Sequence, residues 1–109
     1  MRIWDLSPSI LCRQHLLGEH RELHSIWTVL TKNKKGYSKH PETLRWVGKL
    51  AALYKRHEEL VLEMQSRGYT HKSPLEKTLA TGSSKQTTFI NGPQEQLEIL
   101  KSKGCNCKI

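Results

Sequence analysis

Glu22 lies among polar and small side chains on one flank of the first helix that the sequence predicts. At about 100° per residue, Gln14, His15 and Arg21 fall on this flank, away from the apolar stripe of the same helix. A glutamate at the edge of apolar surface is suited to proton transfer. The pattern alone leaves open a second reading, in which Glu22 belongs with Glu19 to an ordinary solvated face.

Gly18 lies on the same flank, inside the predicted helix. Glycine in a helix interior costs roughly 1 kcal/mol relative to alanine. Either a ligand approaches the helix backbone at this position, or another helix packs closely against it.

Three main helices are expected to position these residues. The first begins at Ser7-Pro8 and runs to about Thr31, the second spans residues 41–67 with Gly68 as its C-terminal cap, and the last spans residues 93–103. Apolar residues recur every three or four positions and should form the core. They are Leu16, His20, Leu23, Trp27, Leu30, Trp46, Leu50, Leu53, His57, Leu60 and Met64.

The remaining segment, residues 70–92, has little periodicity. A capping-box pattern at Ser73-Pro74-Leu75-Glu76 predicts a short helical turn, and Thr81-Gly82-Ser83-Ser84 predicts a flexible loop. A weak strand pattern occurs at residues 87–90. A segment of this length is expected to wrap the core or to contact a ligand. The fold class is therefore all-α, a compact single domain over residues 1–109 with three main helices and long connecting loops.

The composition favours a polyanionic partner. Eighteen Lys and Arg against ten Asp and Glu give a formal charge of +8 in 109 residues, and nucleic acid is the commonest partner of such small basic domains. A basic loop contains Lys32, Lys34, Lys35, Tyr37, Lys39 and Arg45. This loop either tracks phosphates or forms a solvated face. No segment is long and apolar enough to span a membrane, and no secretion signal is recognised, so we expect a cytoplasmic protein.

Cysteines and histidines give only a weak indication of a metal site. Cys105 and Cys107 in the tail could bind a metal with Cys12, but structural zinc sites need four ligands and no fourth is evident. We therefore expect two tail thiols and no metal. His20 and His24 are expected to be packing or surface residues, and His57 is expected to be a hydrogen-bonded core histidine.

Short motifs at fixed spacing run through the first seventy residues. Those of the first helix region are Arg2-Ile3, Gln14-His15-Leu16 and Glu19-His20-Arg21-Glu22-Leu23. Those of the second helix and its end are Lys49-Leu50, Lys55-Arg56, Glu59-Leu60 and Arg67-Gly68-Tyr69. In this set the chain resembles the bacteriophage endonuclease V family, the pyrimidine-dimer DNA glycosylases.

This resemblance implies a mechanism and a set of site residues. In that family the N-terminal α-amine attacks the sugar C1′ of the damaged nucleotide and forms an imine, while a glutamate assists sugar opening and β-elimination. The matched positions imply Met1 and Glu22 as the catalytic groups. The matched DNA-binding residues are Arg2, Gln14, His15 and Arg21.

The chain also departs from the family pattern. Met1 stands where the phage enzyme begins with threonine after losing its initiator methionine, and Ser25 replaces a further arginine of the first helix. The aromatic C-terminal segment linked to recognition of the lesion is absent. The preferred lesion is therefore left open between pyrimidine dimers and another damaged base.

The sequence thus predicts a DNA repair glycosylase with abasic-site lyase activity. Its partner would be double-stranded DNA that contains damaged bases or abasic sites, and we expect it to act as a monomer without a cofactor and without a membrane. Two alternatives remain: a non-catalytic, basic nucleic-acid-binding module, and a structural interaction protein. Loss of activity in Glu22→Gln would favour the enzyme.

Overall fold

Helices account for all the regular elements of the computed structural model, which describes residues 2–36, 38–71 and 73–108. In chain order the elements are η1 (Pro8–Ile10), α1 (Arg13–Lys32), α2 (Pro41–Leu44), α3 (Leu50–Ser66), η2 (Lys77–Leu79) and α4 (Pro93–Ser102). Within the described residues no strand forms, and β-type pairing is limited to an isolated bridge between Lys49 and Gly82. The all-α expectation is confirmed.

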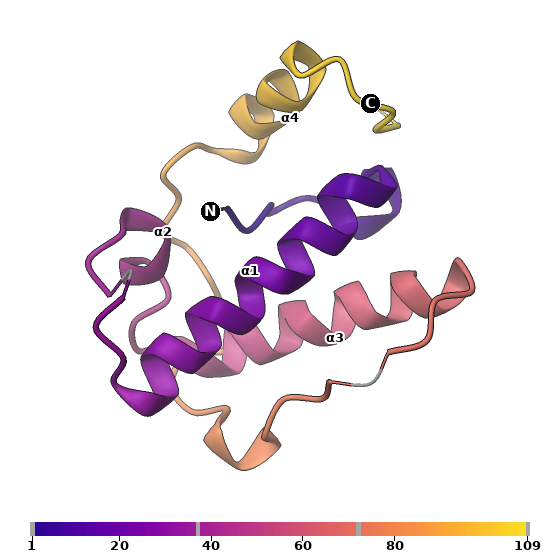
Figure 1. Ribbon diagram of the computed structural model, residues 1–109. Helices are drawn as coiled ribbons and strands as arrows, with labels where there is room; N and C mark the ends of the chain where they lie inside the picture. Colours follow the sequence, from indigo (N-terminus) through magenta and orange to yellow (C-terminus); the bar gives the residue numbers. More distant parts are fainter. Residues whose placement is uncertain (1, 37, 72, 109) are drawn as a thin grey trace.

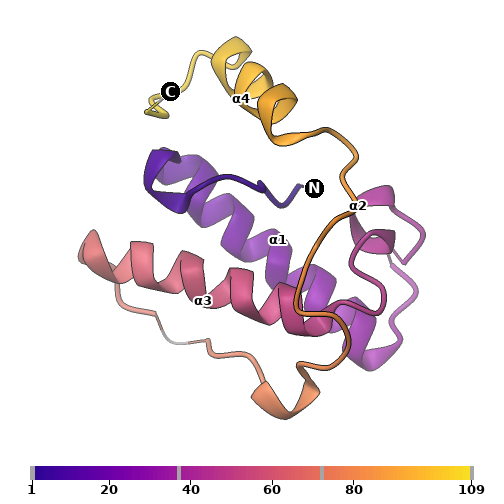
Figure 2. The ribbon, with the colours of Figure 1, turned by 180° about the vertical axis from the view of Figure 1, so that it is seen from behind.

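Helices α1 and α3 form the main layer of the fold and lie side by side in both views (Figures 1 and 2). Their facing stripes are largely as expected, since Leu16, Leu23, Leu53 and Leu60 are fully buried. The N-terminal segment, α2, α4 and the long loop close the core with Ile3, Trp4, Leu11, Trp46, Leu75 and Leu100. No helix in the described ranges is both long and apolar enough to cross a membrane.

The first helix begins later than the sequence predicted. Pro8–Ile10 form a short 3₁₀ turn, and Leu11 and Cys12 then take extended conformations, with ψ of 136° and 168°. The helix therefore starts at Arg13 and ends at Lys32, beside Asn33 in the left-handed region at φ 51°. This break at Leu11 and Cys12 points the start of α1 toward the C-terminal tail, where Lys108 N–H donates to the Ile10 carbonyl at 2.7 Å.

The second predicted helix is also wrong in extent, because it divides into α2 and α3 at Gly48. Gly48 has φ +74°, which favours glycine and ends the helical turn before α3 begins. Backbone carbonyls of Thr81 and Ser83 accept from the amides of Ala51 and Ala52, at 2.8 and 3.0 Å. The loop thus caps the first turn of α3, which confirms that it wraps the core.

Gly82 allows the loop to approach this closely. Its φ is +81°, and a Cβ at this position would overlap the Gly48 carbonyl oxygen. The loop continues through Leu75, which is buried, and the helical turn predicted at residues 73–76 is found slightly later as η2.

Two buried arginines, Arg45 and Arg56, hold the N-terminal segment. Arg45, expected in the basic loop, is only 6% exposed. It pairs with Glu42 and with Asp5, the latter at 2.9 Å, and its Nη2 donates to the Ile3 carbonyl at 2.9 Å. A guanidinium supplies five donors, so one side chain can satisfy all these acceptors. The expectation that Arg45 belongs to a phosphate-tracking surface is therefore wrong.

Arg56 of α3 holds the N-terminal segment at its other end, near Leu6. Its Nε and Nη2 donate to the two carboxylate oxygens of Glu19 at 2.6 and 3.0 Å, and its Nη1 donates to the Leu6 carbonyl at 2.7 Å. Glu19 is 2% exposed, so the reading of Glu19 as part of a solvated face is wrong. The N-terminal segment is fixed by its backbone carbonyls at both Ile3 and Leu6.

We expect Arg45→Ala to destabilise the fold by about 3–5 kcal/mol, because it leaves the buried Glu42 carboxylate unpaired. Urea denaturation followed by circular dichroism measures this change. Lys35→Ala, at an exposed position in the connection after α1, is the control and should change the free energy of unfolding by less than about 0.5 kcal/mol. A loss below about 1 kcal/mol in Arg45→Ala would contradict the anchoring role, given the size expected for a buried pair.

Candidate active site

A pocket of about 360 Å³ lies where the N-terminal segment meets α1 and α4. The segment runs between these two helices in both views (Figures 1 and 2). We call this hollow the N-terminal pocket. Its lining residues are Arg2, Trp4, Gln14, His15, Gly18, Glu19, Glu22, Ile99 and Lys103.

Four of the six predicted site residues line this one pocket: Arg2, Gln14, His15 and Glu22. Arg21 is exposed and lines a neighbouring hollow on α1 instead, together with His20, His24 and Ser25. Met1, the predicted nucleophile, lies outside the described residues, but it is joined directly to Arg2. The structure therefore brings the predicted carboxylate into one pocket with Arg2.

Glu22 and Glu19 both line the pocket but differ in their partners. Glu19 is buried and paired with Arg56. Glu22 is half-buried, and no ion pair within residues 2–36, 38–71 and 73–108 includes it. Because Glu19 is held by a guanidinium, Glu22 is the better candidate for exchanging protons with a bound molecule.

Contacts with the Trp4 ring link Arg2 and His15, two polar residues of the pocket. The guanidinium of Arg2 lies over the Trp4 ring, with Cζ 5.1 Å from its centroid. The Trp4 ring meets the His15 imidazole edge to face, with centroids 5.7 Å apart. Burial, followed by the nearby charge of Lys103, lowers the pKa of His15, so this imidazole is neutral at pH 7.

Sequence reasoning missed Trp4, Ile99 and Lys103. Lys103 follows the last residue of α4, and nothing in the helical pattern indicated which part of the chain it would face. With Arg2 it places two cationic side chains around a pocket that also contains a carboxylate. Such a pocket can hold an anionic backbone group and exchange a proton beside it.

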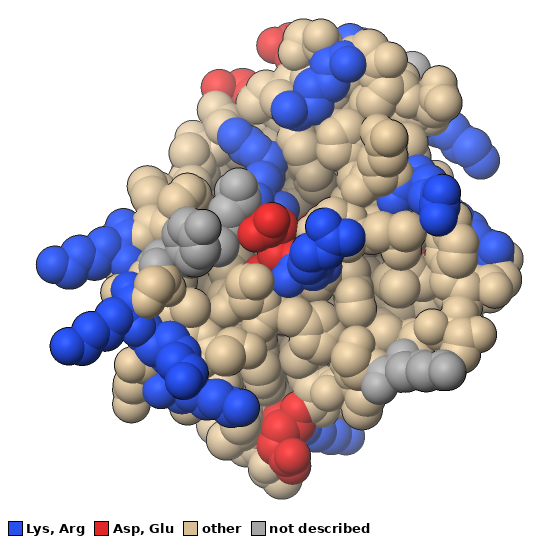
Figure 3. Space-filling view, in the orientation of Figure 1, with Lys and Arg blue, Asp and Glu red and all other residues tan. Residues whose placement is uncertain are grey.

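The basic loop after α1 keeps all four of its predicted lysines at the surface. Lys32, Lys34, Lys35 and Lys39 are all exposed. Figure 3 shows Lys and Arg side chains projecting together at the lower left, where Figure 1 places the end of α1 and its connection to α2. Tyr37, which the sequence placed in this loop, lies outside the described residues.

Two further groups of side chains converge in the fold, and one of them shares His15 with the N-terminal pocket. The tail cluster contains Cys12, His15, Cys105 and Cys107, and the histidine cluster contains His20, His24, His57 and His71. In each, all four donor atoms lie within 4.8 Å of one another. Burial, together with the neighbouring imidazoles, lowers the pKa of His20 to about 4. His57 is fully buried and hydrogen-bonded to Glu58, as expected of a core histidine.

Comparison with known proteins identifies a family for most of the chain. The model of the family described as pyrimidine dimer DNA glycosylase matches residues 1–77. That range contains every predicted site residue and the whole of α1, α2 and α3. No curated protein and no solved structure gives a significant match.

Gly18→Ala tests what the glycine in α1 is for. Apart from its two chain neighbours and the backbone of its own helix, none of the described residues has an atom within 4 Å of a Cβ built at Gly18, so close packing of another helix does not explain it. We expect the substitution to raise the free energy of unfolding by up to about 1 kcal/mol, from helix propensity alone, as measured by urea denaturation. Gly48→Ala should have the opposite sign, because φ is +74° there. If Gly18→Ala instead lowers the free energy of unfolding, close packing of another helix against Gly18 would again be the better explanation.

Proposed function

Because the chain belongs to the pyrimidine dimer DNA glycosylase family, a family of DNA repair enzymes, we propose that its N-terminal pocket performs base removal and strand cleavage through the α-amine of Met1. The family makes damaged DNA the substrate and favours an enzyme over a non-catalytic binding module. The observation that carries the proposal is the meeting of Glu22 with the start of the chain in one pocket.

The proposed reaction has two stages. The neutral amine attacks C1′ of the damaged nucleotide, the C1′–N bond breaks, and the base leaves with the bonding electron pair and takes up a proton. Opening of the sugar ring then gives an imine between the amine nitrogen and C1′. Removal of a C2′ proton expels the 3′ phosphate and cleaves the strand.

Glu22 is the residue proposed to exchange these protons. In its protonated form the carboxyl group gives a proton to the ring oxygen as the sugar opens, and the carboxylate that this leaves later takes the C2′ proton. The N-terminal amine suits the nucleophilic role because an α-amine has an ordinary pKa near 7.7–8.0, so part of it is neutral at physiological pH. A lysine amine, with an ordinary pKa near 10.4, would need a much larger shift.

DNA binding is assigned to the residues around the pocket and to the basic surface. We propose that Arg2 and Lys103 hold phosphates flanking the reacting sugar, that Gln14 and His15 line the sugar site, and that Arg21 contacts the backbone from the adjacent hollow. Exposed lysines after α1 extend the contact along the duplex, so affinity should fall steeply with salt. A monomer can supply all these groups.

The damaged nucleotide must leave the base stack for its C1′ to meet the amine. The substrate class is pyrimidine dimers or a related damaged base. Gly18 lies in the pocket wall without a Cβ, which leaves room for a sugar–phosphate backbone to approach α1. Gly18→Ala, although expected to be stabilising, should therefore reduce cleavage.

Glu22→Gln tests the proposed acid–base role. On a duplex that carries one pyrimidine dimer, we expect strand cleavage to fall by about 10²- to 10⁴-fold, the usual contribution of a positioned general acid or base. Affinity for the same duplex should change little, because glutamine preserves the shape of the side chain. Glu98→Gln, on the exposed face of α4, is the matched control and should cleave at the wild-type rate.

A variant with one extra residue ahead of Met1 tests the amine in the same cleavage assay. It converts the amine into an amide and should abolish cleavage while leaving the pocket residues intact. Wild-type cleavage by Glu22→Gln, or by the extended chain, would remove the corresponding group from the mechanism.

A further inference from the structure

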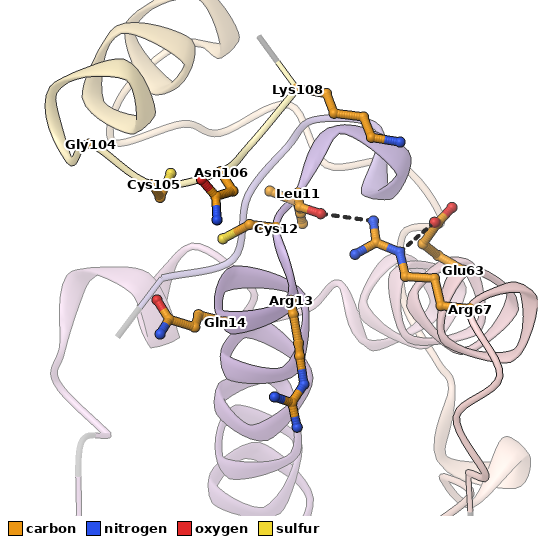
Figure 4. Close-up of a pocket in the computed structure, with 10 residues that line it drawn as sticks. All are labelled: Leu11, Cys12, Arg13, Gln14, Glu63, Arg67, Gly104, Cys105, Asn106 and Lys108. Carbon is orange, nitrogen blue, oxygen red and sulfur yellow. Dashed lines mark hydrogen bonds and ion pairs between the residues drawn. The ribbon is translucent and has the colours of Figure 1, made fainter.

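The tail cluster has the composition of a structural metal site. Its donors are the three thiols of Cys12, Cys105 and Cys107 and one imidazole nitrogen, Nδ1 of His15. They come from the two ends of the chain: Cys12 directly precedes α1, His15 lies in its first turn, and the other two follow α4. Figure 4 shows the tail at Cys105 and Asn106 lying over Cys12.

The distances in this cluster fit one bound cation. His15 Nδ1 lies 3.1 Å from Cys12 Sγ and 3.3 Å from Cys107 Sγ. Sulfur and nitrogen ligands of a tetrahedral Zn²⁺, at about 2.3 and 2.0–2.1 Å from the metal, stand about 3.6 Å apart. The four donor atoms therefore already surround a position at which a zinc ion could bind all of them after small movements of the side chains.

The backbone around the cluster also fits thiolate ligands. The Cys12 amide donates to Cys107 Sγ at 3.1 Å, which stabilises negative charge on that sulfur. The amide of Lys108, the residue after Cys107, donates to the Ile10 carbonyl and so holds the tail in place. Three thiolates and one imidazole form a closed set of four ligands, which is typical of structural rather than catalytic zinc.

We propose that Cys12, His15, Cys105 and Cys107 bind one Zn²⁺ ion that fastens the C-terminal tail to the start of α1. Binding releases the three thiol protons to solvent, including the one that Cys105 donates to the Leu100 carbonyl. The ion would hold the residues after α4 against the N-terminal pocket. Coordination through Nδ1 leaves Nε2 of His15 protonated, as a donor available to a substrate.

Cobalt substitution tests this site directly. Untagged, reduced, metal-free protein is titrated with Co²⁺, and we expect thiolate-to-cobalt charge-transfer absorption that saturates at one equivalent and disappears when Zn²⁺ displaces Co²⁺. In Cys105→Ser this absorption should weaken, and Zn²⁺ affinity should fall at least about 100-fold. Asn106→Ala, an exposed residue between the two tail cysteines, should match the wild type.

Absence of charge-transfer absorption from the reduced wild-type protein would overturn the proposal, as would unchanged Zn²⁺ affinity in Cys105→Ser. Neither readout measures cleavage, so failure here is distinguishable from failure of the proposed enzyme mechanism.

The histidine cluster independently supports a second metal site. His20 and His24 lie one turn apart on α1, His57 faces them from α3, and His71 follows α3. Nε2 of His24 lies 3.2 Å from that of His20 and 3.1 Å from that of His57. Nε2 of His20 is also 3.1 Å from that of His71.

Hydrogen bonds among the rings explain this convergence poorly. Each neutral Nε2 carries either one hydrogen or one lone pair, yet those of His20 and His24 each face two other nitrogens. Four lone pairs directed at one cation satisfy all of them, and nitrogen ligands of tetrahedral Zn²⁺ stand about 3.3 Å apart. Glu58 Oε1, 3.2 Å from Nδ1 of His57, can fix the proton there and leave Nε2 free to coordinate.

We infer that these four Nε2 atoms bind a second ion, a divalent first-row metal such as Zn²⁺, which holds the segment after α3 against α1. Long-range ¹H–¹⁵N spectra test it, since one equivalent of Zn²⁺ beyond the tail site should move four histidine Nε2 signals to the metal-bound position. His15, coordinated through Nδ1, and His40, outside both clusters, are internal controls.

In His71→Ala, Zn²⁺ should no longer move the four histidine Nε2 signals together. In Thr70→Ala, at the adjacent exposed position, the four signals should move as in the wild type. Unmoved Nε2 signals in the wild type, or unaltered shifts in His71→Ala, would overturn the second site.

Discussion

The fold depends on holding a short, non-helical N-terminal segment in a fixed place. Residues 2–6 have no helical ladder to satisfy their backbone, so buried side chains must do so. Arg45 reaches this segment from the turn after α2 and donates to the Ile3 carbonyl, and Arg56 reaches it from α3 and donates to the Leu6 carbonyl. Each guanidinium is neutralised by a buried carboxylate, Glu42 or Glu19. These contacts fix the position of residues 3–6.

That constraint connects structure to chemistry. An N-terminal nucleophile is useful only if the start of the chain is presented beside its acid–base partner, and the anchored segment places Arg2 in the same pocket as Glu22. The C-terminal part completes this pocket, since α4 contributes Ile99 and is followed by Lys103. Asp5 also binds Gln96 of α4 through its amide and its carboxylate, at 2.7 and 3.0 Å. The proposed tail zinc would reinforce the same arrangement.

Helical periodicity was sufficient to predict the all-α fold, the buried stripes and the flank that carries Glu22. It could not predict the interruption at Gly48, because a left-handed glycine there depends on a loop that returns from more than thirty residues away. Charge patterns also failed to predict which charged residues are buried, because burial depends on ion pairs formed only in the folded chain. The sequence placed Arg45 and Glu19 at the surface, but both form buried ion pairs. The fourth ligand of the tail cluster, His15, was hidden for the same reason, since only the folded chain brings it to Cys107.

Borohydride trapping on an abasic-site duplex, followed by mass mapping of the adduct, tests the central claim most directly. The protein must be untagged and its free N-terminus verified beforehand. The account predicts one covalent adduct, carried by the α-amine of Met1. An adduct on a lysine side chain, or no adduct from protein with a free N-terminus, would contradict it.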